Sequence, residues 1–482
     1  MKGRWMTPSI TPPALRPSRL RLLALLISAA VLGGCASFSP DGGFSAIEKA
    51  ARDHLGKDVQ RARTDADRDR IDQRVAELLA KPLTMDDAVQ VALLNNRGLQ
   101  ATYAELGITE AEVVQAGRLP NPGFSFGRLT RGSEVEFQRG LHFNLARLIA
   151  LPFIGQMEAR RFEQTKSMVA MQVLSLAADT RKAWINALAA EESVRYMRQV
   201  RQAAEASSEL ARRMAQVGNF NKLQRAREQV FYADASLNLA RAEQSQRATR
   251  ERLTRLLGAW GAQTRFALPD RLPDLPKGVT ELPDIERVAL EQRLDVQGAR
   301  LAAERTARNL GLTKTTRFIN VLELGVLRNS SNEAPTQSGW EIGFELPLFD
   351  WGSARVARAE AVYMQTVHHA AETAINARSE VREAYAGYRL AFDIARHHRD
   401  EIVPLRQRIA EENQLRYNGM LIGVFELLAD ARAQIVSVNN AIESLRDFWL
   451  AQADLDMALV GKPSLAMPGG PATTAEPGGA AH

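Results

Sequence analysis

The chain has 482 residues, of which 45% are hydrophobic and 24% are charged, and its formal net charge is +6. Five basic residues and no acidic residue lie in the first 34 positions, so the remainder carries 57 basic and 56 acidic side chains. This balance excludes the strong positive field with which nucleic-acid-binding proteins attract phosphates, so we expect no nucleic-acid partner. The single cysteine excludes an internal disulfide bond.

The first 34 residues predict a signal peptide. A basic stretch precedes the apolar run 22–32, which is too short to span a bilayer, and small residues follow as far as Cys35. The ending Leu-Gly-Gly-Cys resembles the bacterial lipoprotein signal, which implies that Cys35 carries a lipid anchor. Ala36 resembles the residue that directs such proteins to the outer membrane. An ordinary signal peptide with a chance cysteine is the alternative.

Residues 35–82 should form a lipidated tether followed by a charged helix. The segment 47–79 alternates acidic and basic residues around few apolar ones, a pattern typical of a solvated surface helix. The tail 463–482 is rich in proline, glycine and alanine, so we expect it to be disordered.

Two copies of one structural plan occupy the rest of the chain. Leu83–Gln100 resembles Glu281–Gln297, and similar matches continue along both copies. We therefore predict two structural repeats, 83–268 and 284–462, joined by the linker 269–283.

Each repeat should contain a helix, a β-hairpin and a long helical hairpin. The first helices are expected at 84–117 and 284–314, each as one uninterrupted segment. Alternating apolar residues predict the β-hairpins at about 119–146 and 317–348. Their strands are expected at Phe124–Leu129, Leu141–Leu145, Phe318–Leu327 and Trp340–Leu346.

Long helices should follow both β-hairpins. Pro152 is expected to mark the exit from the first, with a helix from Phe153 to a turn near Gly218. The second long helix should extend to a turn near Gly419, with a kink at Pro404. Apolar residues at steps of three and four predict coiled-coil packing of the returning helices. These stripes comprise Ala226, Val230, Ala233, Leu237 and Ala240, and Leu428, Ala431, Ile435, Val438, Ile442, Leu445 and Trp449.

Four short strands would leave exposed sheet edges, which must be paired or closed. Outer-membrane barrels made from one chain have at least about eight strands, so closure here needs two or three chains, and an aqueous lumen favours three. The sequence therefore predicts a mainly α-helical fold with a small membrane β part, in which a homotrimer closes a 12-stranded β-barrel.

The lipoprotein signal, the tandem repeat, the paired strands and the glycine-broken helical turns together resemble the outer-membrane efflux factor family, the TolC-like channels. The resemblance covers about 83–462 and is sharpest at Tyr417–Arg432, which is similar to the family's second helical turn. It implies a trimeric barrel in the outer membrane, with long helices forming an α-barrel tunnel in the periplasm. The tunnel's closed tip would dock on a periplasmic adaptor protein and an inner-membrane pump. The chain would then be the passive channel of a tripartite efflux pump.

The two helical turns are the expected docking tip. They comprise Val217, Gly218, Asn219, Phe220, Gly419, Met420 and Leu421. Both glycines should act as helix C-caps. Some family members carry aspartates three and six residues after the second glycine. Ile422 and Phe425 stand at those positions, which implies an apolar constriction in place of an acidic one.

No pattern in the sequence indicates an enzyme or a cofactor. Motifs of metalloproteases, of nucleophile elbows and of phosphate-binding loops are lacking. The pairs His368–His369 and His397–His398 are not chelates, because neighbours on a helix point about 100° apart. A periplasmic adaptor lipoprotein and an envelope scaffold without a pore are the alternative functions. Drugs, metal ions and polypeptides all remain open as cargo.

Overall fold

The computed structural model describes residues 37–318 and 321–463, except the side chains of Val424 and Phe425. The predicted signal peptide, Cys35 and residues 464–482 lie outside the described residues. The chain divides into two compact units, and both repeats contribute to each. Of the described residues, the sheet unit comprises those within 37–42, Thr109–Ala159 and Arg308–Ala359, and the helical unit comprises those within Gly43–Ile108, Arg160–Ala307 and 360–463.

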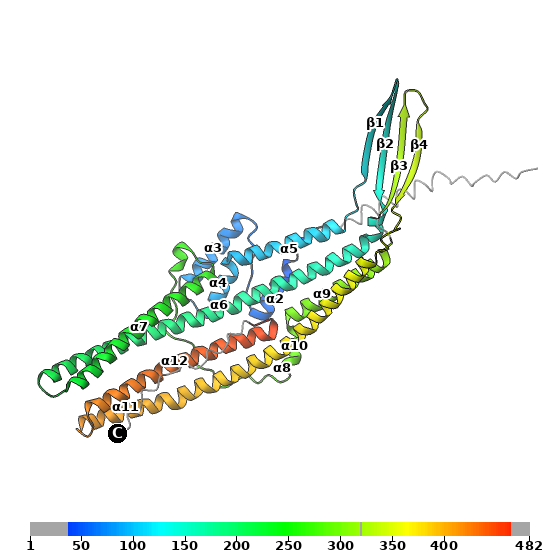
Figure 1. The fold of residues 1–482 in the computed structure, drawn as a ribbon. Helices are drawn as coiled ribbons and strands as arrows, with labels where there is room; N and C mark the ends of the chain where they lie inside the picture. The colour runs from blue at the N-terminus through cyan, green and yellow to red at the C-terminus, as the bar shows by residue number, and fades with distance from the viewer. Residues whose placement is uncertain (1–36, 319–320, 464–482) are drawn as a thin grey trace, which may run out of the picture. The chain divides into compact units, whose positions relative to one another are not determined.

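The sheet unit contains four antiparallel strands in the order β1-β2-β3-β4 (Figure 1). β1 Gly123–Arg131 and β2 Glu134–Asn144 form one hairpin, and β3 Leu322–Ser331 and β4 Gln337–Phe344 form the other. Both expected hairpins are therefore present. β2 pairs with β3, so the two repeats join through the centre of the sheet.

The third strand begins at Leu322, four residues later than predicted. The Phe318 ring meets the Trp351 ring edge-on, with 6.2 Å between their centroids. The Arg317 guanidinium lies 4.3 Å from the centroid of the same ring. Phe318 is thus held in a side-chain cluster before the strand, where its apolar ring has its own packing partners.

Each β-hairpin leads into long helices that turn back on themselves (Figure 1). The first helical hairpin is α6 Leu145–Gln216 and α7 Lys222–Leu257, and the second consists of α10 Ser353–His397, α11 Val403–Asn418 and α12 Val424–Val460.

The expected start of the first long helix after Pro152 is wrong, because α6 begins at Leu145 and contains the proline. The Asn144 side-chain oxygen accepts a hydrogen bond from Arg147 N at 2.8 Å. This bond satisfies a backbone donor of the first turn and starts the helix ahead of Pro152.

The second long helix is irregular just before Pro404, where the sequence predicted a kink. A single π-helical turn, η2 His398–Ile402, separates α10 from α11, and Pro404 lies at the start of α11. Proline has no N–H and its ring collides with the carbonyl four residues earlier. The wider π turn accommodates that loss within a continuous helical path.

The helix that opens each repeat is broken, although the sequence predicted a single helix in both. Asn96 and Arg293 stand at the breaks, and their backbones are extended, with ψ of 115° and 122°. They occupy matching positions of the two repeats. The resulting helices are α4 Met85–Asn95, α5 Arg97–Ala116, α8 Ile285–Gln292 and α9 Leu294–Thr316.

The charged segment at 47–79 is not one solvated helix. It forms α2 Phe44–Leu55 and α3 Asp65–Leu79, and a capping box between Thr64 and Asp67 begins α3. Both helices bury apolar side chains in the core of the helical unit, because these recur at helical spacing. The buried residues are Phe44, Ile47, Ala51, Ile71, Val75 and Leu78.

Each repeat has its own apolar core in the helical unit. In the first, Trp184 and Leu188 of α6 pack with Leu253 and Leu257 of α7. In the second, Phe448 of α12 packs among buried side chains of α10. The two cores anchor the helices that lead to the tips.

Candidate functional site

The first helical tip is a Schellman turn between α6 and α7. Asn219 N donates to Met214 O at 2.9 Å, and Gly218 N donates to Ala215 O at 3.3 Å. This pair of bonds defines the turn. Gly218 has a φ of +81°, a left-handed conformation that glycine adopts without steric cost. Gly218 is therefore a helix C-cap glycine, as predicted.

The second tip contains the same turn, displaced by one residue. Leu421 N and Met420 N donate to carbonyl oxygens of the last turn of α11, at 2.8 and 3.0 Å. Met420 takes the left-handed position with a φ of +58°, whereas Gly419 has a φ of −81°. The structural counterpart of Gly218 is therefore Met420. The pairing of Gly218 with Gly419 in the sequence repeat is therefore wrong by one residue. Met420 adopts the left-handed conformation there, although glycine would adopt it more readily.

Some apolar side chains of the two tips are exposed to solvent, and others are buried or half-buried. Phe220 is buried and Ile422 is half-buried, and each stands two residues after the left-handed position of its turn. The side chain of Phe425 lies outside the described residues, so only Ile422 of the predicted constriction is placed. The exposed side chains are Val217 at 71%, Met420 at 93% and Leu421 at 77%.

The predicted apolar stripe of α7 is exposed to solvent, and Leu223, which was not part of the prediction, extends it toward the tip. Leu223, Val230 and Leu237 are 60%, 59% and 50% exposed, at exact seven-residue intervals. An exposed alanine follows each of them three positions later, at Ala226, Ala233 and Ala240. The two sets form the a and d positions of a heptad repeat, which is the pattern of a seam between helices. Within the described chain this seam is left open to solvent.

On another face of α7, a buried ion pair links the two repeats. The Glu228 side chain is 2% exposed, and its carboxylate accepts from Arg432 Nη2 of α12 at 2.7 Å. Ser207 Oγ of α6 donates to the same carboxylate at 2.7 Å. The Arg432 guanidinium also lies 4.3 Å from the centroid of the Phe231 ring. Sequence reasoning missed this pair, since its partners lie 204 positions apart.

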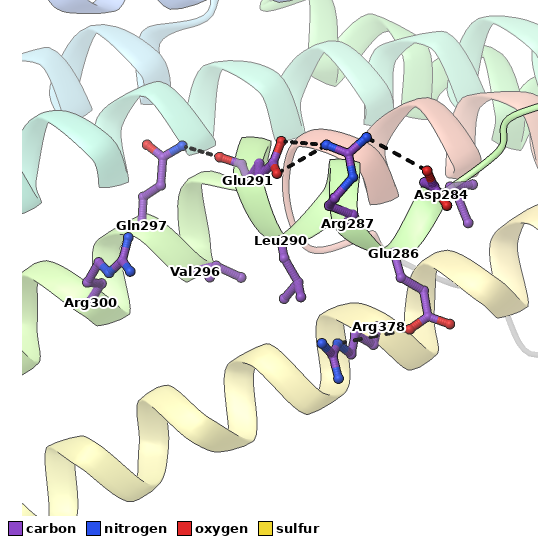
Figure 2. Close-up of a pocket in the computed structure, with 10 residues that line it drawn as sticks. Asp284, Glu286, Arg287, Leu290, Glu291, Val296, Gln297, Arg300 and Arg378 are labelled. Atoms are coloured by element: carbon purple, nitrogen blue, oxygen red, sulfur yellow. Dashed lines mark hydrogen bonds and ion pairs between the residues drawn. The ribbon is translucent and has the colours of Figure 1, made fainter.

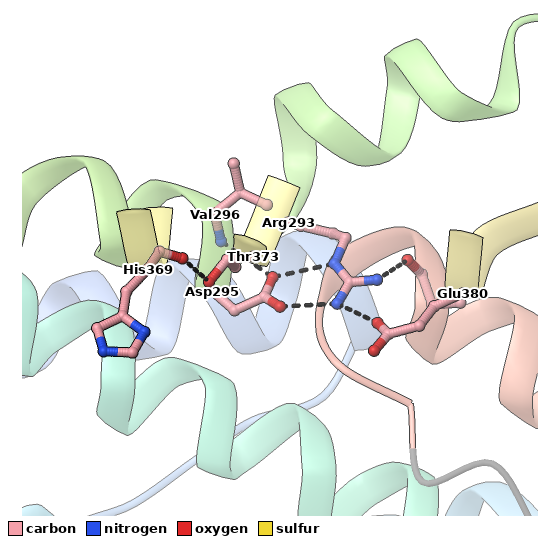
Figure 3. Close-up of polar contacts among 7 residues, drawn as sticks. Arg293, Asp295, Val296, His369, Thr373 and Glu380 are labelled. Atoms are coloured by element: carbon pink, nitrogen blue, oxygen red, sulfur yellow. Dashed lines mark hydrogen bonds and ion pairs between the residues drawn. The ribbon is translucent and has the colours of Figure 1, made fainter. Parts of the chain in front are cut away.

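A second buried charge lies at the break before α9 (Figure 3). The Arg293 side chain is 1% exposed and donates to Asp295 Oδ2 and Glu380 Oε2, both at 2.7 Å. It also donates to Ala458 O at 3.4 Å. Burial alone would lower the pKa of Arg293, but the two carboxylates outweigh burial and raise it. The guanidinium therefore stays charged and ties α9, α10 and α12 together.

The matching break in the first repeat uses neutral amides. Asn95 Nδ2 donates to Leu257 O at 3.1 Å, and Asn96 Nδ2 donates to Leu256 O at 3.0 Å. Leu257 corresponds to Ala458 in the other repeat, so both breaks bind the same part of the returning helix. Gly258 makes this approach possible, because a Cβ there would lie 2.7 Å from Asn95 O.

One face of the sheet is apolar in the rows nearest the helices. A row of paired residues crosses all four strands as Phe124, Leu141, Val326 and Trp340. Phe143, Leu324 and Ile342 form the next row, followed by Leu322 and Phe344. Phe124, Trp340 and Phe344 are 68%, 73% and 63% exposed. A contiguous exposed surface of this kind marks a contact with lipid or protein.

The opposite face of the sheet is polar and rich in glycine. The row beside the apolar one reads Gly123, His142, Gly325 and Glu341, and a further row reads Gly127, Gln138, Asn329 and Gln337. Such alternation is the pattern of outer-membrane strands, with lipid on one side and water on the other.

An open groove of about 1100 Å³ lies where α8, α9 and α10 meet (Figure 2). Its charged side chains pair with one another. Arg287 lies 3.2 Å from Glu291 and 3.9 Å from Asp284, and Arg378 lies 3.9 Å from Glu286. Such mutual pairing of exposed charges is typical of a solvated helix junction.

Among the described residues, no group of three or more His, Cys, Asp or Glu side chains could hold a metal ion. In the same part of the chain, no helix has the length and apolar character that a membrane crossing needs. His369 lies 3.2 Å from Glu372 of the same helix, and His397 at the end of α10 lies 3.2 Å from Glu401 of η2.

No protein-family model matches the chain. A curated relative, the cobalt-zinc-cadmium resistance protein CzcC of Cupriavidus metallidurans, is 26% identical over 289 residues, or 56% of this chain. The match spans 64% of CzcC, which is less than two thirds of its length.

Solved structures of outer-membrane proteins share the fold over most of the chain. The open MtrE outer membrane channel of Neisseria gonorrhoeae matches 78% of this chain and 89% of its own, with a TM-score of 0.65 and 19% identity. The outer membrane protein VceC of Vibrio cholerae matches 78% of this chain and 96% of its own, with a TM-score of 0.65 and 14% identity. The chain therefore has the TolC-like fold of these outer-membrane proteins, as its sequence predicted.

Proposed function

We propose that this chain is the outer-membrane channel of a tripartite efflux system, a passive trimeric conduit through which small solutes leave the cell. The observation that carries the proposal is the four-stranded sheet, with one apolar and one polar face, in a chain that also forms two long helical hairpins. The strands have 9, 11, 10 and 8 residues. Crossing the outer membrane takes about 9–11 residues in a tilted strand.

Closing a barrel would require other copies of the chain. β1 and β4 are the outer strands of the described sheet, so each has one free edge. β4 of one copy and β1 of the next would run antiparallel, since direction alternates through the four strands. Three copies would supply twelve strands, enough to surround an aqueous lumen.

The open seam of α7 supports the same assembly. Leu223, Val230 and Leu237 present a heptad face that nothing in the described chain covers. A long helix with such a face is stabilised when another helix packs along it. A neighbouring copy provides that helix in a homotrimer.

The two tips are the proposed docking surface for a periplasmic adaptor protein, which would connect the channel to an inner-membrane pump. Val217, Met420 and Leu421 supply exposed apolar contacts there. Opening would separate the tips, with Ile422 and Phe425 as an apolar constriction that closes by dewetting. The energy for transport would come from the pump.

Divalent transition-metal cations are the proposed cargo, because the relative CzcC is named for resistance to cobalt, zinc and cadmium. The location would be the outer membrane, with a lipid on Cys35 as an additional anchor. An adaptor lipoprotein is less favoured, since it would have one helical hairpin flanked by β-domains. A scaffold without a pore would have no use for a sheet with one apolar and one polar face.

The test is planar-bilayer conductance of the detergent-purified protein, together with its mass by light scattering. We expect a trimer and stepwise currents. Replacing Val230 and Leu237 together by glutamate should abolish both while the helical circular dichroism persists. Asn238→Glu, at an exposed position of α7 beside the seam, should retain both. A folded wild-type trimer that carries no current would refute the channel and favour the scaffold.

A further inference from the structure

The polar face of the sheet holds one histidine between two specific partners. His142 on β2 places Nε2 2.9 Å from Ser125 Oγ on β1 and Nδ1 3.2 Å from Glu341 Oε1 on β4. His142 and Glu341 lie in one row across the sheet, separated by Gly325 on β3. Side chains from three strands therefore meet at a single imidazole ring.

Two glycines leave the space for this arrangement. A Cβ at Gly325 would lie 2.6 Å from Glu341 Cγ and 2.7 Å from Glu341 Oε1, so any other residue would push the carboxylate away from His142. A Cβ at Gly140 would lie 2.5 Å from Ser125 Oγ and 2.9 Å from His142 Nε2. The Ser125 hydroxyl and His142 Nε2 can therefore meet over Gly140 because that residue has no side chain.

The contacts determine how the ring presents its nitrogens. An ionised carboxylate only accepts hydrogen bonds, so Nδ1 of His142 carries the proton and donates to Glu341. Nε2 then has the lone pair and accepts from the Ser125 hydroxyl. Histidines that bind metals commonly donate their other ring N–H to a carboxylate, which fixes the tautomer and makes the free nitrogen a better ligand.

We propose that His142 Nε2 is a transit ligand for divalent transition-metal cations. Glu341 is its positioning residue, and the Ser125 hydroxyl is the group that a cation displaces. Imidazole nitrogen suits zinc, copper and nickel, whereas magnesium and calcium prefer oxygen ligands. This inference rests on the proposed function, because the polar face borders a lumen only if the sheet closes a barrel.

A weak site is what transport requires. With one protein nitrogen and water as the other ligands, a cation binds loosely, in keeping with the lack of a three-ligand cluster among the described residues. Conduction needs binding that is favourable enough for entry and weak enough for release. His142 would thus favour entry of transition metals over magnesium without trapping them.

The test records bilayer currents of the full-length protein with Zn²⁺ and, separately, with Mg²⁺. Zn²⁺ should interrupt or reduce the wild-type current, and Mg²⁺ at the same concentration should not. His142→Asn should abolish the Zn²⁺ effect. Glu341→Gln should weaken the apparent Zn²⁺ affinity roughly 10–100-fold. Gly325→Ala should weaken it in the same direction, because it displaces Glu341.

His369→Asn is the matched control. His369 is also 3.2 Å from a carboxylate, that of Glu372, but the pair lies on an exposed face of α10. Its Zn²⁺ response should equal that of the wild type. An undiminished response in His142→Asn, or an equal loss in His369→Asn, would overturn the inference.

Calorimetric titration with Zn²⁺ separates this inference from the proposed channel. In detergent, His142→Asn should lose one weak Zn²⁺ site per chain, whether or not the protein conducts. A wild-type protein that conducts but shows neither Zn²⁺ block nor this site would overturn the metal ligand alone. A protein that binds Zn²⁺ at His142 but carries no current would count against the channel.

Discussion

Replacing Arg432 with methionine should destabilise the folded protein by about 3 kcal/mol. Glu228 is 2% exposed, and without Arg432 its carboxylate would keep only the Ser207 hydroxyl among its described hydrogen-bond partners. Removing one partner of a buried ion pair costs about 3–5 kcal/mol. Arg432 is 35% exposed, and solvent screens part of its charge, so the lower end of that range applies.

Denaturant unfolding in detergent, followed by circular dichroism, measures this change. A cycle with Glu228→Gln, Arg432→Met and the double variant should give a coupling energy of about 1–3 kcal/mol. The pair Arg198–Glu243 is the control, since it also joins two helices at 3.2 Å but its partners are 57% and 35% exposed. Arg198→Met should cost less than about 1 kcal/mol.

The same variant tests how the proposed channel would open. Glu228 lies on α7 and Arg432 on α12, so their pair must break if the two helical hairpins separate near the tips. We expect Arg432→Met to conduct more than the wild type in bilayers without an adaptor, and Arg198→Met to conduct equally. Additive energies in the cycle, or equal stability of the two arginine variants, would refute the reasoning.

Three further predictions follow from the helical unit. Met420→Gly should raise stability by up to about 1 kcal/mol, and Gly218→Ala should lower it by about 1 kcal/mol, because both positions are left-handed; unfolding midpoints check both. Arg293→Met should lower the free energy of unfolding by about 3–5 kcal/mol, measured with denaturant, because the Asp295 and Glu380 carboxylates lose their cation. A small loss would show that the two carboxylates become protonated instead. Burial raises the pKa of Asp454, despite its ion pair with Lys182. The stabilising contribution of Asp454 is therefore full at a pH below the ordinary pKa of an aspartate, and it declines as the pH rises through the raised pKa. The melting temperature of the wild type relative to Asp454→Asn should then increase on acidification. A difference that stays constant with pH would contradict this.

The elements that local pattern determines could be predicted from the sequence. Alternation along 124–129 and 141–145 indicated two of the strands, and glycine or proline marked the tip at Gly218 and the interruption at Pro404. These signals are local, since they depend on side-chain period and backbone freedom within a few residues.

The helix breaks could not be predicted, because no local signal marks them. Neither Asn96 nor Arg293 disfavours a helix strongly. The breaks persist because side chains there donate to carbonyl groups about 160 residues away in sequence, among them Leu257 O and Ala458 O. Long-range hydrogen bonds of this kind are invisible to periodicity, as is the partner of Glu228.

The sequence identified the α7 stripe but not its partner. Apolar residues at helical spacing indicate that some other segment packs against that face of the helix. In the described part of the chain no segment does so at Val230 and Leu237, which are exposed. A pattern shared by intramolecular cores and subunit seams cannot separate the two.

The displacement of the second tip has a consequence for symmetry. A trimer of a chain with two repeats would present six helical turns in an approximately sixfold arrangement. The turns that contain Gly218 differ from those that contain Met420 in backbone register and in side chain. In such a trimer the true symmetry would be threefold, and the ends would alternate between the two kinds. A partner that binds all six must offer two distinct complementary surfaces or one that tolerates both, whereas a partner with a single selective surface can occupy only every second position.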